Sequence, residues 1–280
     1  MKRTTSEIFP GALVTIPVPG VARPLDGFWL PGRCRHATLV LIIHGMGGNF
    51  YRSQLKKEWL WQAAGYGFDV LTFNNRGSDR AVAFERFENC VADIDAALAV
   101  GRRLGYRRFV LLGHSTGCQK IALYQARRQH PAVRALVLAA PADDLAICRR
   151  DLGPRYNYWL KHARKLVTQG KGDTLLPMLY EKFSARRFLS IADPRSVEAQ
   201  LLNYAGQLRH FRRVRCPVLA FLGTREEFAC RPVVEMGEIL RQKTRASIFE
   251  FFTVTGGDHG FHGHEAATVR RAYRWLHAVV

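Results

Sequence analysis

The sequence predicts an α/β fold with a mostly parallel central sheet, helices on both faces and a helical insertion. Short apolar runs alternate with longer amphipathic stretches over most of the chain, whereas residues 145–212 show helical patterns without a clean strand. Strands that alternate with helices are typical of parallel sheets covered on both sides. With 280 residues, 48% of them hydrophobic, the chain is long enough for one large domain that carries an insertion.

The apolar runs are continuous, which is typical of strands that are buried on both faces. These predicted strands are 37–45, 68–77, 107–115, 133–141, 216–223 and 248–257. The segment 8–30 is rich in Pro and Gly, and we expect it to form an antiparallel hairpin at one edge of the sheet.

Amphipathic stretches predict the helices that cover this sheet. They are 52–65, 85–104, 117–129 and 264–279. Glycines and prolines divide the region without strands into three further helical patterns, which are 155–168, 174–184 and 195–211. We therefore expect a core made of residues 1–144 and 213–280, with residues 145–212 as a helical insertion.

The chain is strongly basic, with a formal net charge of +19. Nucleic acid, a membrane surface or acidic small molecules are the partners that such a charge favours. The basic residues are not interleaved with a nucleic-acid motif, and the longest apolar run, Leu39 to Ile43, is too short to cross a bilayer. The first twenty residues contain Glu7 and three prolines rather than a continuous apolar segment. We expect a soluble cytoplasmic protein that binds a small molecule.

Six cysteines are scattered along the sequence, and no two form a C-x-x-C pair. Free thiols fit a reducing compartment, and the spacing supports neither a zinc ribbon nor a redox motif. The cysteines are Cys34, Cys90, Cys118, Cys148, Cys216 and Cys230. No cofactor is expected.

The stretch 109-FVLLGHSTGCQKIALY-124 places Ser115 between an apolar run and a helical pattern. A serine hydroxyl becomes a nucleophile when a base takes its proton and the turn presents its oxygen clear of the backbone. Such a turn strains the serine, and small residues two positions away relieve the crowding between strand and helix. Gly113 and Gly117 occupy those positions. Ser115 is therefore the predicted nucleophile.

A serine nucleophile predicts an acid and then a histidine, each after a later strand. The loop 224-TREEF-228 supplies Glu226 and Glu227, and Asp258-His259 follows the last strand. His259 would take the proton from Ser115, and a glutamate would orient its imidazole. We favour Glu226 and keep Glu227 as the alternative acid. Asp258 is a weaker candidate, since a neighbour in sequence cannot easily reach around its own histidine.

An oxyanion hole is expected where the first central strand ends, at 43-IHGMGGNFYRS-53. Glycines such as Gly45 let the backbone approach a substrate carbonyl, and the predicted donors are the amides of Met46 and Thr116. A phosphate loop is the alternative for such a glycine-rich turn. This segment lacks the Lys-Ser/Thr pair of a phosphate loop and the spacing of a dinucleotide fingerprint.

The segment Asp258 to Glu265 also contains His262 and His264, so a metal site is the alternative interpretation. Its spacing matches no standard zinc motif, and one catalytic histidine accounts for its centre. We expect no metal here. His114, inside the serine turn, is expected to pack beside Ser115.

These segments resemble the α/β-hydrolase superfamily along nearly the whole chain. The matching features are HGMGG, NNRG, GHSTG, TREEF and GGDHGF. The resemblance implies an α/β-hydrolase fold, a triad of Ser115, a loop carboxylate and His259, and a cap formed by residues 145–212. GHSTGCQ with DHGFHGHE is similar to the fungal siderophore-releasing serine esterases and their bacterial relatives. The acid in this superfamily is more often Asp, whereas this loop offers only Glu.

The leading hypothesis is a serine hydrolase that cleaves a carboxylic ester through an acyl-enzyme intermediate. A thioesterase, a lactonase or an amidase would use the same triad, and the motifs do not separate them. An alternative from another class is a basic binding protein built on a hydrolase scaffold. Loss of the triad would indicate such a protein, whereas here all three members are present in sequence.

The segment Leu145 to Arg215 contains fifteen Lys and Arg residues and five acids, so it carries an excess of ten of the nineteen positive charges. If it covers the site, this charge would concentrate anionic ligands near the entrance. We therefore expect an anionic or siderophore-like ester as substrate. The alternative is that these side chains point outward and solvate the helices.

Overall fold

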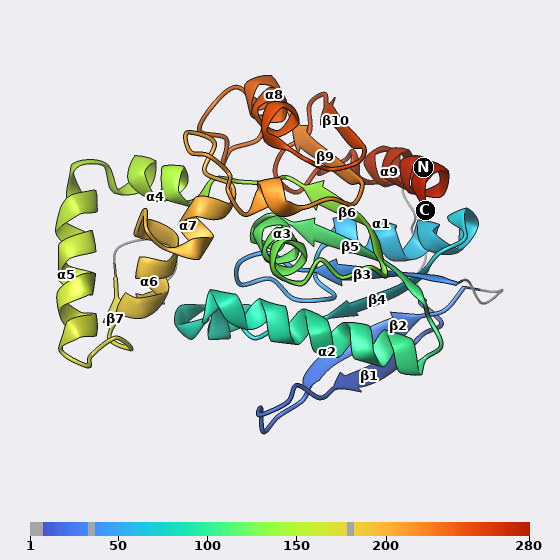
Figure 1. Ribbon diagram of the computed structural model, residues 1–280, viewed down its shortest axis with the longest axis horizontal. Coiled ribbons are helices and arrows are strands. Elements are labelled where there is room, and N and C mark those ends of the chain that lie inside the picture. Colours follow the sequence, from blue (N-terminus) through green and yellow to red (C-terminus); the bar gives the residue numbers. More distant parts are fainter. Residues whose placement is uncertain (1–7, 33–36, 178–181) are drawn as a thin grey trace.

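The computed structural model describes residues 8–32, 37–177 and 182–280, and its centre is an eight-stranded sheet (Figure 1). The strand order is β1-β2-β4-β3-β5-β6-β9-β10. The strands are β1 Ala12–Ile16, β2 Leu25–Leu30, β3 Thr38–Ile43, β4 Asp69–Phe73, β5 Arg108–His114, β6 Val133–Ala139, β9 Val218–Gly223 and β10 Phe249–Val254. All six apolar runs form strands, as predicted.

The six strands β3, β4, β5, β6, β9 and β10 are mutually parallel, and the hairpin β1–β2 adds to β4 in the antiparallel sense. The predicted edge hairpin is therefore confirmed. All residues of β3, β4 and β9 are buried, as expected of strands covered on both faces. For β10 this expectation is wrong. Only Phe252 is buried there, because β10 is the edge strand next to β9.

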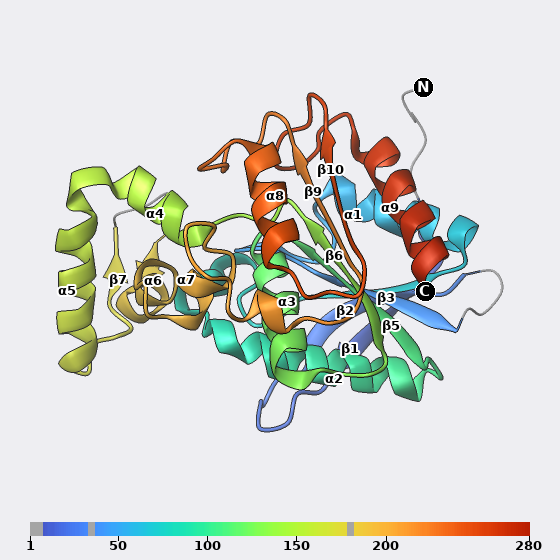
Figure 2. The same ribbon diagram turned by 45° about the horizontal axis from the view of Figure 1, so that its top comes forward.

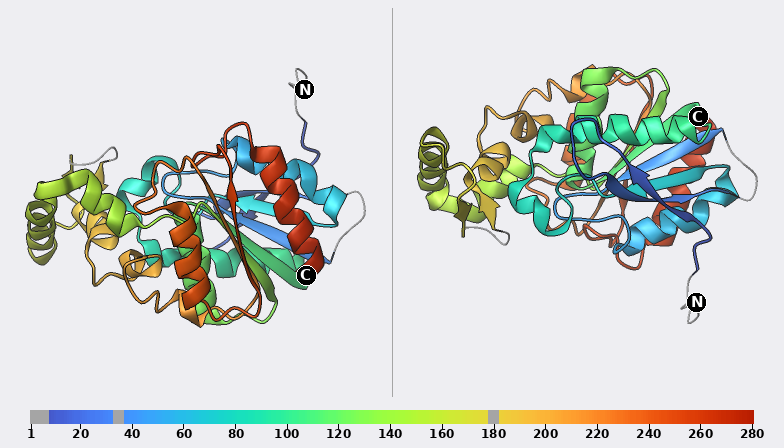
Figure 3. Two further views of the ribbon diagram at one scale, coloured as in Figure 1. Left: turned by 90° about the horizontal axis from the view of Figure 1, so that it is seen from above. Right: turned by 90° about the horizontal axis from the view of Figure 1, so that it is seen from below.

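Helices cover both faces of the sheet (Figures 2 and 3). Helices α1 and α9 pack on each other on one face, whereas α2, α3 and α8 lie on the other. Their bounds are α1 Gln54–Ala63, α2 Cys90–Arg103, α3 Thr116–Arg128, α8 Val233–Lys243 and α9 Glu265–Val279. Sequence patterns predicted four of these helices and missed α8, which connects β9 to β10.

The chain between β6 and β9 forms a helical region that lies to one side of the sheet (Figure 1). We call it the insertion. It contains α4 Asp144–Leu152, α5 Tyr156–Thr168, α6 Ala185–Ala192, α7 Val197–Leu201 and the two-stranded ribbon β7 Leu175–Leu176 with β8 Phe183–Ser184. Side-chain oxygens of Asp143, Ser184 and Ser196 accept hydrogen bonds from the first turns of α4, α6 and α7. These caps explain where the three helices begin.

Two expectations for this region need correction. The pattern 155–168 forms α5, but the helix expected over 174–184 is wrong, since its ends form the antiparallel strands β7 and β8. Part of that range lies outside the described residues. The helix expected over 195–211 is short, since α7 ends at Leu201 and turns follow it.

The insertion has its own apolar cluster, separate from the main core. The buried members from the insertion are Leu145, Cys148, Leu152, Tyr156, Leu160, Ala163, Leu176, Phe183, Ala185, Phe188, Ile191, Ala192 and Ala199. Two residues of the core domain join this cluster, Val82 as a buried member and Met46 packed against it. The insertion therefore packs directly on loops at the carboxyl edge of the sheet.

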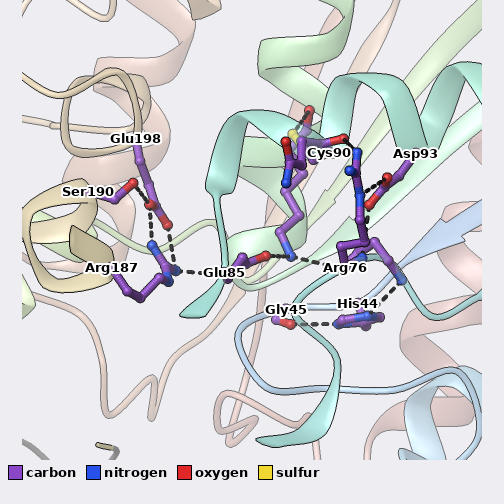
Figure 4. A network of polar contacts seen from close by, with 12 residues as sticks. His44, Gly45, Arg76, Glu85, Cys90, Asp93, Arg187, Ser190 and Glu198 are labelled. Atoms are coloured by element: carbon purple, nitrogen blue, oxygen red, sulfur yellow. Dashed lines mark hydrogen bonds and ion pairs between the residues drawn. The ribbon is translucent and has the colours of Figure 1, made fainter. Parts of the chain in front are cut away.

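A chain of buried charges also joins the insertion to the core (Figure 4). Arg187 of α6 binds both Glu198 of α7, with Nη2 2.9 Å from Oε1, and Glu85 of the core, with Nη2 3.1 Å from Oε2. The other oxygen of Glu85 lies 2.7 Å from Nζ of Lys120 in α3. These four side chains are at most 2% exposed. Since two cations alternate with two carboxylates, their charges balance.

We expect Arg187→Met to lower the free energy of unfolding by about 3–5 kcal/mol, because Glu198 would stay buried without its cation. Urea denaturation measures this loss. The neighbouring Arg186→Met is the matched control. Its side chain is 39% exposed and lies 3.9 Å from Asp173, so its removal should cost less than about 1 kcal/mol. Equal losses in both variants would contradict the role of the buried pair.

Candidate active site

Ser115 lies on a strained turn between β5 and α3. Its φ is 57° and its ψ is −129°, a backbone conformation that residues with a side chain rarely adopt. Its N–H donates to the carbonyl oxygen of Ala139 at 2.9 Å, so β6 holds the turn in place. The side chain is directed into a cavity instead of packing in the sheet. This is the geometry expected of a presented nucleophile.

Three glycines permit this turn. A Cβ on Gly113 would lie 2.3 Å from the backbone of Gly117, and a Cβ on Gly117 would lie 2.3 Å from the carbonyl oxygen of Ile43. A Cβ on Gly45 would lie 2.8 Å from the Cβ of Ser115. Strand β5, helix α3 and the loop after β3 therefore meet in backbone contact around the serine, as the supporting role predicted for these glycines requires.

His259 lies in the loop after β10 and is paired with an acid from the loop after β9. Its Nδ1 is 2.7 Å from Oε1 of Glu226, whose side chain is 1% exposed. Glu227 instead accepts a hydrogen bond from the backbone N–H of His259 at 2.9 Å. Asp258 binds the ring of His262 at an exposed site, 2.8 Å away. The geometry thus distinguishes three acids that the sequence left open, and only Glu226 contacts the imidazole of His259.

One cavity of about 400 Å³ is lined by Ser115 and His259 and by Met46 and Thr116, the two predicted oxyanion residues. Its size falls in the range of small-molecule sites. The lining residues are Gly45, Met46, Gly47, Gly48, Asn49, Arg52, Ser53, Lys56, His114, Ser115, Thr116, Ala142, Asp144, Ile147, Phe228 and His259. Helix α4 of the insertion contributes Asp144 and Ile147, so the insertion forms part of the wall. The assignment of the Met46 and Thr116 amides as oxyanion donors stays a prediction.

Hydrogen bonds connect the loop after β3 to the buried charged side chains described above (Figure 4). Lys120 Nζ donates to Asn75 Oδ1 at 3.0 Å, and the backbone N–H of Asn75 donates to His44 Nε2 at 3.2 Å. His44 Nδ1 therefore carries the hydrogen and donates to the carbonyl oxygen of Gly45 at 2.7 Å. Burial, with the charge of Lys120, lowers the pKa of His44 well below its usual value. A neutral histidine thus orients the peptide that precedes Met46.

His114 has a role that sequence reasoning missed. Its Nε2 lies 2.9 Å from the carbonyl oxygen of His259, so it ties the serine turn to the histidine loop. Burial, with the nearby charge of His259, lowers the pKa of His114 to about 3. The ring is therefore neutral over the physiological range and donates one hydrogen bond.

Asp144 is the one carboxylic acid among the residues that line the cavity. Its Oδ2 accepts a hydrogen bond from Gln119 at 2.8 Å. Burial, with the negative charge of Glu198, raises the pKa of Asp144 well above its usual value. Its surroundings therefore disfavour the charged form of this carboxyl group.

The comparison with known families gives the class of the protein. Residues 40–272 match the profile of the Alpha/beta hydrolase family. The chain therefore belongs to that family, and its fold is the α/β-hydrolase fold. No curated protein sequence matches it significantly.

Solved structures of esterases and lipases share this fold. The siderophore hydrolase EstB from Aspergillus fumigatus is similar with a TM-score of 0.75 and 16% identity, over 97% of this chain and 98% of that chain. Est1E from Butyrivibrio proteoclasticus, solved with ferulic acid, has a TM-score of 0.73 and 15% identity, over 95% and 98%. A monoacylglycerol lipase from Paleococcus ferrophilus has a TM-score of 0.68 and 17% identity, over 91% and 99%. At these identities the likeness concerns the fold.

In the described ranges, no helix combines the length and apolar character needed to cross a bilayer. Across the same part of the chain, no three His, Cys, Asp or Glu side chains converge as metal ligands. His262 and Asp258 form an exposed pair instead.

Acidification is expected to destabilise the protein through His114. The unfolded state takes up a proton near the ordinary pKa of 6.5, whereas the folded state does so only near a pKa of about 3. The free energy of unfolding should therefore decrease as the pH is lowered between these values, by up to about 1.4 kcal/mol per pH unit for one proton. His114→Gln, whose amide can donate to the same carbonyl, should reduce this slope in urea titrations. The exposed His277→Gln is the control, and an unchanged slope in His114→Gln would contradict the expectation.

Proposed function

We propose that the protein is a serine hydrolase that cleaves a carboxylic ester through an acyl-enzyme intermediate. The observation that carries the proposal is the 2.7 Å contact between Glu226 Oε1 and His259 Nδ1, with His259 and Ser115 lining one cavity. An acid bound at Nδ1 leaves Nε2 as the proton acceptor for the serine. A hydrolase of this family with that arrangement is suited to acyl transfer.

In the proposed reaction, Ser115 Oγ attacks the carbonyl carbon of the ester while His259 Nε2 takes its proton. The imidazolium then protonates the leaving alcohol, and the acyl group stays on Ser115. Water attacks the acyl-enzyme in the same way, with His259 as base and then as acid, so that a carboxylic acid is released and Ser115 regains its proton. Glu226 orients the imidazole and stabilises its cation.

The oxyanion of each tetrahedral intermediate is assigned to the backbone N–H groups of Met46 and Thr116. Both residues line the cavity together with Ser115, and Thr116 begins α3, whose N-terminal dipole favours negative charge. The contact from His44 to Gly45 supports the loop that carries Met46.

We propose that residues 145–212 act as a cap. Ile147 lines the cavity and Met46 packs against the apolar cluster of the insertion, which supports a role in covering the substrate.

A siderophore-like ester is a candidate substrate because of the likeness to EstB. Five cysteines are free in the described chain, in keeping with a cytoplasmic location.

A fluorophosphonate should label Ser115, and Ser115→Ala should abolish labelling and lower kcat toward simple aryl esters by about 10⁴–10⁶-fold. Ser53→Ala is the matched control, since Ser53 lines the same cavity on an ordinary helix start. Mass spectrometry locates the adduct and a chromogenic assay gives kcat. Near-normal hydrolysis by folded Ser115→Ala protein would refute the mechanism.

Substitution of the two adjacent glutamates by glutamine should have very different effects on kcat. Glu226→Gln is expected to lower kcat by about 10³–10⁴-fold, because an amide at Nδ1 favours the wrong tautomer of the imidazole. Glu227→Gln should lower it less than about tenfold, since its amide oxygen can still accept from the backbone N–H of His259. The opposite ranking would assign the orienting role to Glu227.

A further inference from the structure

One wall of the cavity carries two cations that the reaction above does not use. Arg52 and Lys56 both line it, at the point where the loop after β3 enters α1. The side chain of Asn49 shapes this entry, since its Oδ1 accepts hydrogen bonds from the backbone N–H groups of Tyr51 at 3.2 Å and Arg52 at 2.9 Å. The loop that carries the proposed oxyanion donor therefore also fixes the position of both cations.

Lys56 is buried, with 5% of its surface exposed. Its ammonium donates to the carbonyl oxygen of Asn49, which uses one of its three N–H groups. Within the described chain, no carboxylate forms an ion pair with Lys56. Burial lowers the pKa of Lys56 to about 8, while the charge of Asp79 opposes that shift. A buried ammonium with unused donors is costly to desolvate, and an anion beside it would offset that cost.

The charges around this wall leave it positive. Arg52 is 69% exposed at the side chain, and its Nη1 lies 3.1 Å from Oδ1 of Asp79, which balances one of the two cations. The first turn of α1 contains no acid, so its N-terminal amides add to the positive potential. Asp144, the one acid that lines the cavity among the described residues, has a raised pKa, so its negative charge is disfavoured.

We propose that Arg52 and Lys56 form a subsite for a carboxylate carried by the ester substrate. The inference rests on the proposed function and gives its substrate class. The sequence predicted a preference for anions from the basic segment 145–215. None of the fifteen basic residues of that segment lines the cavity in the described chain. The selecting charges come from the core domain, beside the loop that carries Met46.

Matched esters test the subsite on either side of the scissile bond. One pair is para-nitrophenyl hydrogen adipate and para-nitrophenyl heptanoate, and the other is meta-acetoxybenzoate and its methyl ester. The unmodified protein should favour the anionic member of at least one pair through KM. Lys56→Met should reduce that preference about tenfold or more and Arg52→Gln about threefold, since each removes a charged hydrogen bond. Lys57→Met, the same charge change on the same helix outside the cavity lining, should leave the preference intact.

Binding provides a readout that does not need turnover. Calorimetry with adipate and benzoate should give binding to Ser115→Ala protein, and the additional Lys56→Met change should weaken it about tenfold. Binding that depends on Lys56 would support the subsite even if no ester is cleaved, in which case only the hydrolase proposal fails. Suppose that Ser115 is labelled and neutral esters are cleaved, but Arg52→Gln, Lys56→Met and Lys57→Met all keep the preference of the unmodified protein between anionic and neutral esters. The subsite is then refuted and the hydrolase proposal stands. Arg52→Gln alone decides the matter if Lys56→Met does not fold.

Discussion

The backbone of Ser115 is the constraint around which the site is arranged. Its positive φ of 57° is tolerated because a carbonyl of β6 accepts its N–H and because a glycine from each of three segments lies there. A Cβ on Gly117 would reach the carbonyl oxygen of Ile43, so α3 can start only where β3 ends. Ser115, the loop after β3 and the N-terminus of α3 therefore lie together at one end of the cavity.

Much of this arrangement could be predicted from the sequence, for physical reasons that differ between elements. Parallel strands buried on both faces need continuous apolar residues, so β3, β5 and β9 stand out in the sequence. The order of serine, acid and histidine, each after a different parallel strand, predicted which loops meet. The sequence favoured Glu226 but left Glu227 open, since adjacent residues in a loop differ mainly in the direction of their side chains. The structure assigns one to the ring of His259 and the other to its backbone.

The features that the sequence did not predict depend on contacts between separate segments of the chain. Arg187 has the pattern of an exposed basic helix residue, yet it is among the largest fully buried side chains. Its burial follows from partners on both sides, Glu198 nearby in sequence and Glu85 far from it. The strands β7 and β8 have two residues each, too few to show a strand period, and they are defined by their pairing with each other. Neither local propensity nor periodicity reports such pairing.

The balanced charges between insertion and core have a consequence for how this protein can diversify. Glu85 and Lys120 belong to the core, whereas Arg187 and Glu198 belong to the insertion, so each part carries one charge of either sign. The apolar cluster could accept many substitutions of similar volume, but loss of one buried charge strands its neighbour. A foreign insertion grafted onto this core would leave Glu85 paired with Lys120, but it would need its own donor for the second oxygen of Glu85, which Arg187 contacts here. The junction between insertion and core is thus set by the hydrogen-bonding requirement of one carboxylate oxygen as well as by apolar packing.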